Sequence, residues 1–374
     1  MNTSVLIGIP CLKTGGTEIQ TLHLVEALTS EGYHCVTVCY FEYEFSMVQA
    51  FERAGSRVVC LSAYGRRPEG NREVYKFLKT GLKRVVDEYR PKIAHIQYMA
   101  PGAMPIVILH RLGIKTIIAT LHTDASIYKS LRMIHFLQRH RVTAFTCVTE
   151  IAERSFFGNS NLFGDDYSLS KRNHLTIPNC LPSNFVFGDR DEHRMTQTIG
   201  LVARLESIKG ADLAIPAFAK ILETNPEYRL IIVGDGKMRP LMEQQQRDFG
   251  IASDRIEWTG KVAYERLGEL YNQMDIVWVP SRSEGFGLSA IEAMAQGCAV
   301  VASNAGGLAE VVHDGKDGLL FQSESADELA SKTKQLISNA ELLSTLRRNA
   351  ITNAQQYTFE NYAKRIKSLY AKLS

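Results

Sequence analysis

The sequence predicts an α/β protein made of two doubly wound, parallel-sheet domains of the Rossmann type. Short apolar runs bounded by turn residues alternate with segments of helical period, and this alternation is typical of βαβ units. A chain of 374 residues is also long for one hydrophobic core. The alternation stops in the polar stretch 184–195, which we interpret as an interdomain linker. We therefore expect domains at 1–186 and 187–357.

The first domain begins with a buried strand, a turn containing Gly15 and Gly16, and a helix that ends at Gly32. Polar, turn-rich residues predict a long loop at 157–173. The expected strands are 5–9, 34–40, 57–61, 93–97, 115–121, 144–149 and 174–177. The other expected helices are 44–54, 71–89, the basic segment 127–141, and one that follows Glu150.

The second domain repeats the same alternation. Its expected strands are 196–203, 228–233, 255–258, 275–279, 298–302 and 318–321. A helix that runs to about residue 223 is expected after the first strand, and another begins at Leu288 and stops at Gly297. Three further helices are expected at 326–338, 340–356 and 359–373.

Composition excludes several classes of protein. Apolar residues make up 45% of the chain and charged residues 22%, as in ordinary globular proteins. The net charge of +3 divides into +6 for residues 1–186 and −3 for the remainder, so we expect no nucleic-acid partner. No apolar run has the length of a membrane span and no signal peptide is evident, which predicts a cytoplasmic protein. Seven Cys without a CxxC pair predict reduced thiols and no structural metal.

The most informative stretch is 280–302, where a turn, a Gly-rich loop, a helix and a buried strand follow one another. Gly285 and Gly287 allow the backbone to approach a ligand closely. The first amides of the helix and its macrodipole attract an anion such as a diphosphate. Glu292, just over one turn into the helix, can bind a ribose diol, and Glu284 can bind sugar hydroxyls. Either glutamate alone would more often be a solvated surface acid.

Other candidate site residues follow predicted strands, where parallel sheets bind their ligands. Arg204 and Lys209 flank a loop that is expected to open a helix, and this arrangement predicts an anion site. Gly234 begins the turn after the next strand. His122 follows the strand 115–121, although a histidine at such a place is more often a satisfied core or rim residue.

Taken together, these motifs resemble the donor-binding signature of glycosyltransferase family 4, a retaining family with the GT-B fold. The resemblance covers the chain from Val5 to the C-terminus and is densest in the second half. The matching positions are Ser281, 284–288 (EGFGL), 292–295 (EAMA), Gly297, 300–302, Gly306, Gly307, 310–312 and 204–210 (RLESIKG).

The resemblance implies a role for each matching residue. Glu284 and His122 would contact the transferred sugar, and Glu292 would contact the ribose of a nucleotide-sugar. Arg204 and Lys209 would bind the diphosphate. The remaining implied binding positions are Gly15 and Gly16 beside donor and acceptor, Gly234 near the nucleotide, and Gly285, Phe286, Gly287 and Leu288 on the sugar and diphosphate.

The resemblance also implies two facing domains with a cleft between them and a last helix, 358–374, that packs back on the first domain. Asp189 and Asp191 mimic the acidic pair with which other glycosyltransferases bind a divalent metal. They follow no strand and lie in a solvated charge run, so we expect no metal site and no cofactor beyond the co-substrate.

We therefore expect a retaining transferase that moves a hexose or related sugar from a UDP- or GDP-sugar to an acceptor hydroxyl of a glycan or lipid-linked acceptor. The sequence does not identify the acceptor, the sugar or the base. One alternative is a GT-B nucleotide-sugar epimerase, and another is a catalytically silent nucleotide-sugar-binding subunit. The basic segment 127–141 is compatible with peripheral membrane contact, although a solvated basic face is the commoner explanation.

Overall fold

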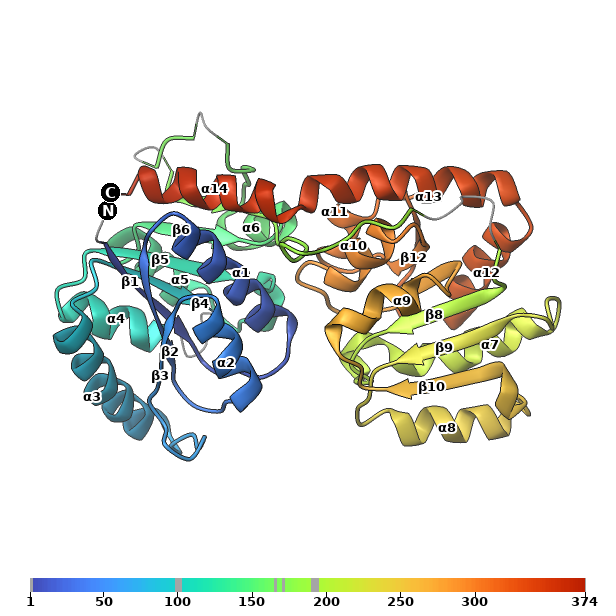
Figure 1. The fold of residues 1–374 in the computed structure, drawn as a ribbon, viewed down its shortest axis with the longest axis horizontal. Helices are drawn as coiled ribbons and strands as arrows, with labels where there is room; N and C mark the ends of the chain where they lie inside the picture. The colour runs from blue at the N-terminus through green and yellow to red at the C-terminus, as the bar shows by residue number, and fades with distance from the viewer. Residues whose placement is uncertain (1–2, 98–102, 165–166, 170–171, 190–194, 374) are drawn as a thin grey trace. The chain divides into compact units, whose positions relative to one another are not determined.

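The computed structural model describes every residue except 1–2, 98–102, 165–166, 170–171, 190–194 and 374 (Figure 1). The chain divides into two compact units. Unit 1 contains Met1–Ser183 and Phe359–Ser374, and unit 2 contains Asn184–Thr358. Each unit has its own parallel sheet and its own hydrophobic core.

Unit 1 is built around a seven-stranded parallel sheet with the order β3-β2-β1-β4-β5-β6-β7. The chain winds outward from β1 in one direction, returns to β4 and continues in the other direction, so the switch point lies between β1 and β4. The strands are β1 (Ser4–Ile9), β2 (His34–Cys39), β3 (Arg57–Cys60), β4 (Ile93–Gln97), β5 (Thr116–Leu121), β6 (Ala144–Cys147) and β7 (His174–Thr176).

Helices bury both faces of this sheet, because its strands are apolar on both sides. The last helix of the chain, α14 (Phe359–Ala371), packs against α1 (Gly16–Ser30). The Tyr370 hydroxyl is hydrogen-bonded to His95 Nδ1 on β4 at 2.9 Å. The other helices of unit 1 are α2 (Phe45–Arg53), α3 (Asn71–Tyr89), α4 (Ala103–Arg111), α5 (Arg132–His140) and α6 (Glu150–Phe157), with the 3-10 turn η1 (Ala125–Ile127).

Unit 2 has a six-stranded parallel sheet with the order β10-β9-β8-β11-β12-β13, and its switch point lies between β8 and β11. The strands are β8 (Thr198–Val202), β9 (Arg229–Val233), β10 (Ile256–Gly260), β11 (Ile276–Val279), β12 (Ala299–Ser303) and β13 (Leu319–Phe321). The helices are α7 (Ala214–Leu222), α8 (Arg239–Asp248), α9 (Leu267–Tyr271), α10 (Leu288–Ala295), α11 (Leu308–Val311), α12 (Ala326–Ile337) and α13 (Ala340–Ala354). The 3-10 turns are η2 (Ser207–Lys209), η3 (Ala211–Leu213), η4 (Ser253–Arg255), η5 (Tyr264–Arg266) and η6 (Gln355–Tyr357).

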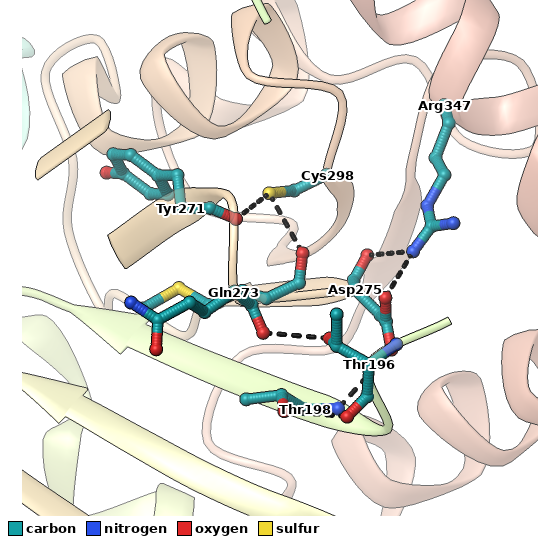
Figure 2. A network of polar contacts seen from close by, with 8 residues as sticks. Thr196, Thr198, Tyr271, Gln273, Asp275, Cys298 and Arg347 are labelled. Atoms are coloured by element: carbon teal, nitrogen blue, oxygen red, sulfur yellow. Dashed lines mark hydrogen bonds and ion pairs between the residues drawn. The ribbon is translucent and has the colours of Figure 1, made fainter. Parts of the chain in front are cut away.

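A buried ion pair attaches α13 to the amino end of β11 (Figure 2). Arg347 Nη2 lies 2.8 Å from Asp275 Oδ1, and the two side chains are 1% and 0% exposed. The backbone amides of Thr196 and Thr198 donate to Asp275 Oδ2 at 2.8 and 3.3 Å. The buried carboxylate is therefore bonded on both oxygens, as a charge inside a core must be.

Two expected helices differ from the structure. The segment 127–141 is helical only from Arg132, because Tyr128 is extended and its ring packs edge-on against Phe156. The helix expected directly after β8 begins only at Ala214, because Gly210 adopts a left-handed conformation with φ 63° between η2 and η3. The helices α4, α8, α9 and α11 were not expected. Their sequences are almost wholly apolar, mostly polar or very short, so they offer too few or too uniformly placed apolar residues to predict a helix.

Candidate active site

The carboxyl ends of β8, β9, β11 and β12 carry most of the residues that the sequence singles out. Parallel neighbours end at the same edge of a sheet, so the loops that follow these strands lie side by side. Arg204 follows β8, Gly234 follows β9, and Glu284 lies in the loop between β11 and α10. Gly306 and Gly307 follow β12. These segments, far apart in sequence, form one cluster in unit 2.

The loop of residues 284–288, which we call the 284–288 loop, packs against the paired glycines that follow β12. The Gly307 amide donates to the Glu284 carbonyl at 2.8 Å. A Cβ atom at Gly306 would overlap the Glu284 carbonyl oxygen, and one at Gly307 would overlap that of Gly285. Gly287 is the N-cap residue of α10 and has φ 106°, a left-handed conformation that favours glycine. Only this glycine pattern lets two backbones approach so closely.

Glu284 is held by two side chains. Lys209 Nζ lies 2.6 Å from Glu284 Oε2, and the hydroxyl of Ser281 donates to the same oxygen at 3.1 Å. The side chains of Lys209 and Glu284 are 23% and 15% exposed, so the pair is mostly shielded from solvent. Lys209 can donate three hydrogen bonds and uses one here, and Glu284 Oε1 forms no hydrogen bond or ion pair with any of the described residues. The carboxylate is thus oriented and still able to accept bonds from a ligand.

A second ion pair, which sequence reasoning missed, connects the η3 turn to Arg282, just before the 284–288 loop. Arg282 donates to both carboxylate oxygens of Asp212 at 2.7 and 2.8 Å. Its amide also donates to the Ile208 carbonyl at 2.9 Å. The hydrogen bonds from Arg282 lower the pKa of Asp212, so the pair stays charged. The available signal was the position of Arg282 inside the motif, between Ser281 and Glu284.

Arg204 is exposed at the exit of β8, and its guanidinium forms no hydrogen bond or ion pair with any of the described residues. Beside it, the chain leaves β9 at Gly234 with φ 126°, and a Cβ there would overlap the Ala203 carbonyl oxygen. The two strand exits are therefore in van der Waals contact. Arg204 has its charge available in this structure, whereas the charge of Lys209 is already paired with Glu284.

Glu292 lies on α10 and is partly buried. The hydroxyl of Tyr264 donates to Glu292 Oε1 and that of Tyr271 to Oε2, each at 3.1 Å. Burial raises the pKa of Glu292 to about 7, and the two hydroxyl hydrogen bonds oppose that rise. Neither tyrosine was singled out from the sequence, because neither belongs to a recognisable motif.

His122 belongs to unit 1, where it directly follows β5. Its Nε2 lies 2.7 Å from Gln97 Oε1 at the end of β4, and burial lowers the pKa of His122 to about 3. The ring is therefore neutral at physiological pH. A cavity of about 20 Å³, large enough for one water molecule, lies beside it. Gln20 from α1 also lines this cavity.

Gly15 is the N-cap residue of α1, and Gly16 is the first residue of that helix. A Cβ at Gly15 would lie 2.6 Å from the carboxylate of Glu18, which is buried one turn into α1. Asp189 is exposed, and Asp191 lies outside the described residues. Within the described part of the chain, no group of three or more His, Cys, Asp or Glu could hold a metal ion.

Two family models together cover most of the chain. The model described as "Glycosyl transferases group 1" matches residues 188–356, and the model described as "Glycosyl transferase 4-like domain" matches residues 15–156. The chain belongs to the family 4 type of GT-B glycosyltransferases. All the unit 2 candidates, from Arg204 to Glu292, lie inside the first match.

Individual relatives of this glycosyltransferase agree with the family. An uncharacterized glycosyltransferase of Methanocaldococcus jannaschii is 25% identical over 368 residues, which is 96% of this chain and 95% of that protein. A D-inositol 3-phosphate glycosyltransferase of Corynebacterium aurimucosum is 33% identical, but over only 47% of this chain and 43% of that protein.

Solved structures agree on the fold. Anabaena HepE in complex with UDP and glucose has a TM-score of 0.80 and 18% identity, covering 99% of this chain and 100% of that one. Sucrose-phosphate synthase from Thermosynechococcus elongatus has a TM-score of 0.78 and 20% identity, covering 100% and 99%. The expected GT-B fold, with two Rossmann-like parallel-sheet domains, is confirmed.

Proposed function

We propose that this glycosyltransferase transfers a hexose or related sugar from a UDP- or GDP-sugar to an acceptor hydroxyl, with retention of configuration. The observation that carries the proposal is the cluster at the carboxyl ends of β8 and β11, where Lys209 Nζ lies 2.6 Å from Glu284 Oε2. A cation, an oriented carboxylate and the amino end of α10 meet there, which suits a sugar joined to a diphosphate. The complexes of Anabaena HepE with UDP and with UDP-glucose support this class of donor.

Each candidate residue then has a proposed task. Arg204 and the free donors of Lys209 bind the diphosphate, together with the amides of residues 286–288. Glu284 accepts hydrogen bonds from the transferred sugar, and Glu292 accepts them from the ribose. In unit 1, His122 is proposed to contact the sugar as a neutral ring, because its pKa of about 3 keeps it uncharged.

Retention is proposed without a covalent intermediate on Glu284. Its Oε2 already accepts hydrogen bonds from Lys209 and Ser281, an arrangement that orients a sugar rather than releases a nucleophile. We propose that the acceptor attacks the face from which the diphosphate leaves, with the leaving phosphate accepting the acceptor's proton. The anomeric configuration of the product, measured by NMR coupling constants, tests retention, and an inverted product would refute it.

Fixed positive charge is proposed to take the place of a divalent metal when the sugar–phosphate bond breaks. Loss of one preorganised donor typically lowers turnover by a factor of about 10² to 10³, so Arg204→Ala is expected to fall in that range. Chelation with EDTA is expected to leave activity unchanged, and Asp189→Ala should match the unmodified protein. Loss of activity in EDTA that Mn²⁺ or Mg²⁺ restores would contradict metal independence.

A glycan or lipid-linked acceptor, in cell-surface glycan or glycolipid synthesis, is proposed from the surface of unit 1. Residues 89–149 contain eight Lys and Arg but one acid, Asp124. On α5, Met133 and Phe136 are 54% and 45% exposed, beside the cationic Arg132 and Arg139. None of the described helices has the length and apolar character needed to span a bilayer.

Such a surface suits peripheral contact with anionic lipid headgroups. Flotation with vesicles of phosphatidylglycerol and phosphatidylcholine at low and high salt tests this contact. Binding at low salt that Phe136→Ala and Arg132→Ala weaken is expected. Absence of binding at low salt would contradict it.

The central experiment is incubation of the protein with a panel of UDP- and GDP-sugars, followed by detection of slow donor hydrolysis, which needs no acceptor. Mass spectrometry of a co-purifying nucleotide-sugar would narrow the panel. Tight binding without turnover across the panel would favour the silent-subunit alternative. Conversion of the donor to an epimer, detected by NMR, would favour the epimerase alternative.

A further inference from the structure

The carboxylate of Glu292 accepts hydrogen bonds from two tyrosines that have no role in the proposed function so far. Tyr264 comes from η5 and Tyr271 from the end of α9, and their hydroxyls lie 3.1 Å from Glu292 Oε1 and Oε2, respectively. Each carboxylate oxygen can accept about two hydrogen bonds, so one site on each remains for another donor. The hydroxyl of Tyr271 is also 3.5 Å from the Ser289 carbonyl, a longer and weaker contact.

We propose that Tyr264 and Tyr271 are positioning residues for ribose recognition, because their hydroxyls hold both oxygens of the Glu292 carboxylate and direct its free lone pairs to the ribose diol. This inference rests on the proposed function and adds two residues to it. The tyrosines do not contact the nucleotide in the proposal, since they act through Glu292.

Tyr271 is itself held rigidly. The Cys298 thiol donates to the carbonyls of Tyr271 and Met274, each at 3.3 Å, at the point where α9 ends (Figure 2). Directly after this segment comes Asp275, which is fixed by the Arg347 ion pair. Tyr271 is also buried. Its hydroxyl is therefore in place before any ligand arrives, which is what a positioning residue requires.

The protonation of Glu292 makes the proposal testable. Burial raises the pKa of Glu292 to about 7, and hydrogen bonds from both hydroxyls to the charged form lower it. Among the described residues, the titratable groups that interact with this carboxyl are Tyr264 and Tyr271, and Cys298 interacts with Tyr271. Burial raises the pKa of Tyr271 well above its usual range, so it stays a donor. Removing either hydroxyl leaves Glu292 protonated to higher pH.

The experiment measures the affinity of the full chain for UDP and for GDP by calorimetry between pH 6 and pH 9. Affinity should fall as the pH is lowered, because Glu292 becomes protonated. In Tyr271→Phe and Tyr264→Phe, the midpoint pH of this fall should rise by about one unit, since each variant loses one charge-assisted hydrogen bond. At pH 7.5 that shift corresponds to about threefold weaker binding. The double variant should shift further.

Two reference variants isolate the effect. Glu292→Gln removes the titrating carboxyl, whereas the terminal phosphate of the ligand still titrates, with a pKa of about 6 as in other phosphate monoesters. In that background, Tyr271→Phe should not change the pH profile. Tyr228→Phe removes the hydroxyl of another buried tyrosine of unit 2 and should reproduce the profile of the unmodified protein.

The possible results separate a positioning role of the two tyrosines from a packing role. An upward shift confined to variants with Glu292 supports the proposal. An unshifted profile, or a loss of affinity that is equal at every pH, would overturn it and leave the tyrosines a packing role. If the unmodified protein binds neither UDP nor GDP, the proposed function itself fails. If the buried Tyr271 variant does not fold, the partly buried Tyr264 still decides the question.

Discussion

The contact between Lys209 and Glu284 allows a quantitative prediction. At 2.6 Å and with exposed fractions of 23% and 15%, the ion pair is a charge-assisted hydrogen bond partly shielded from water, and such bonds contribute about 1.5 to 3 kcal/mol. Lys209→Ala removes this bond and one cation proposed to stabilise the diphosphate. We therefore expect turnover to fall by a factor of about 10² to 10³. Glu284→Gln should lower turnover more than it lowers affinity for the nucleoside diphosphate.

A double-mutant cycle measures whether the two residues act together. Because each single change already disorders the other side chain, Lys209→Ala combined with Glu284→Gln should be less harmful than the product of the single effects. The expected coupling is about 1 to 3 kcal/mol, measured as kcat and kcat/KM for donor hydrolysis.

Lys220 provides the matched control for this cycle. It forms an ion pair with Asp327 at 2.7 Å, but the side chains are 45% and 78% exposed and lie elsewhere in unit 2. Lys220→Ala should change turnover less than twofold, since exposed pairs contribute little. Fully independent effects at Lys209 and Glu284, or normal turnover in Lys209→Ala, would refute the reasoning.

Three further predictions concern the support of the site. Gly307→Ala should displace the 284–288 loop, weaken binding of the proposed donor and lower the free energy of unfolding by about 1 to 3 kcal/mol. Gly268 has room for a Cβ, so Gly268→Ala should change affinity and thermal unfolding very little. Arg347→Ala should lower the free energy of unfolding by about 3 to 5 kcal/mol, because Asp275 would remain buried without its cation, and urea denaturation would show this. Burial holds the folded pKa of Glu292 at about 7, above its ordinary 4.5, so the folded state retains this proton longer than the unfolded chain does. The contribution of Glu292 to the free energy of unfolding should therefore be largest below pH 4.5 and should decrease by up to about 3 kcal/mol between pH 4.5 and 7. The difference from Glu292→Gln, measured in parallel, isolates this contribution.

The alternation of strands and helices could be predicted from the sequence, because parallel strands are buried on both faces and therefore appear as short apolar runs. Each expected strand, from 5–9 to 318–321, appears in the described structure within a few residues. Short apolar runs bounded by turn residues, such as residues 298–302, are typical of strands that are buried on both faces. The 284–288 loop could be predicted equally well, since Glu284, Gly285 and Gly287 are close together in sequence. Helices with few apolar residues, such as α8, could not be predicted in this way.

The sequence by itself determined which residue types stand at the strand ends, but only the tertiary structure decided which of them meet. Lys209 and Glu284 are 75 residues apart and come together because β8 and β11 are neighbours in the sheet although two strands separate them in sequence. The partners of Glu292 likewise come from η5 and α9, and Gly306 and Gly307 are explained only by the loop above them. Local propensity acts over a few residues, whereas hydrogen bonds and close packing depend on distances in space, and strand order sets those distances.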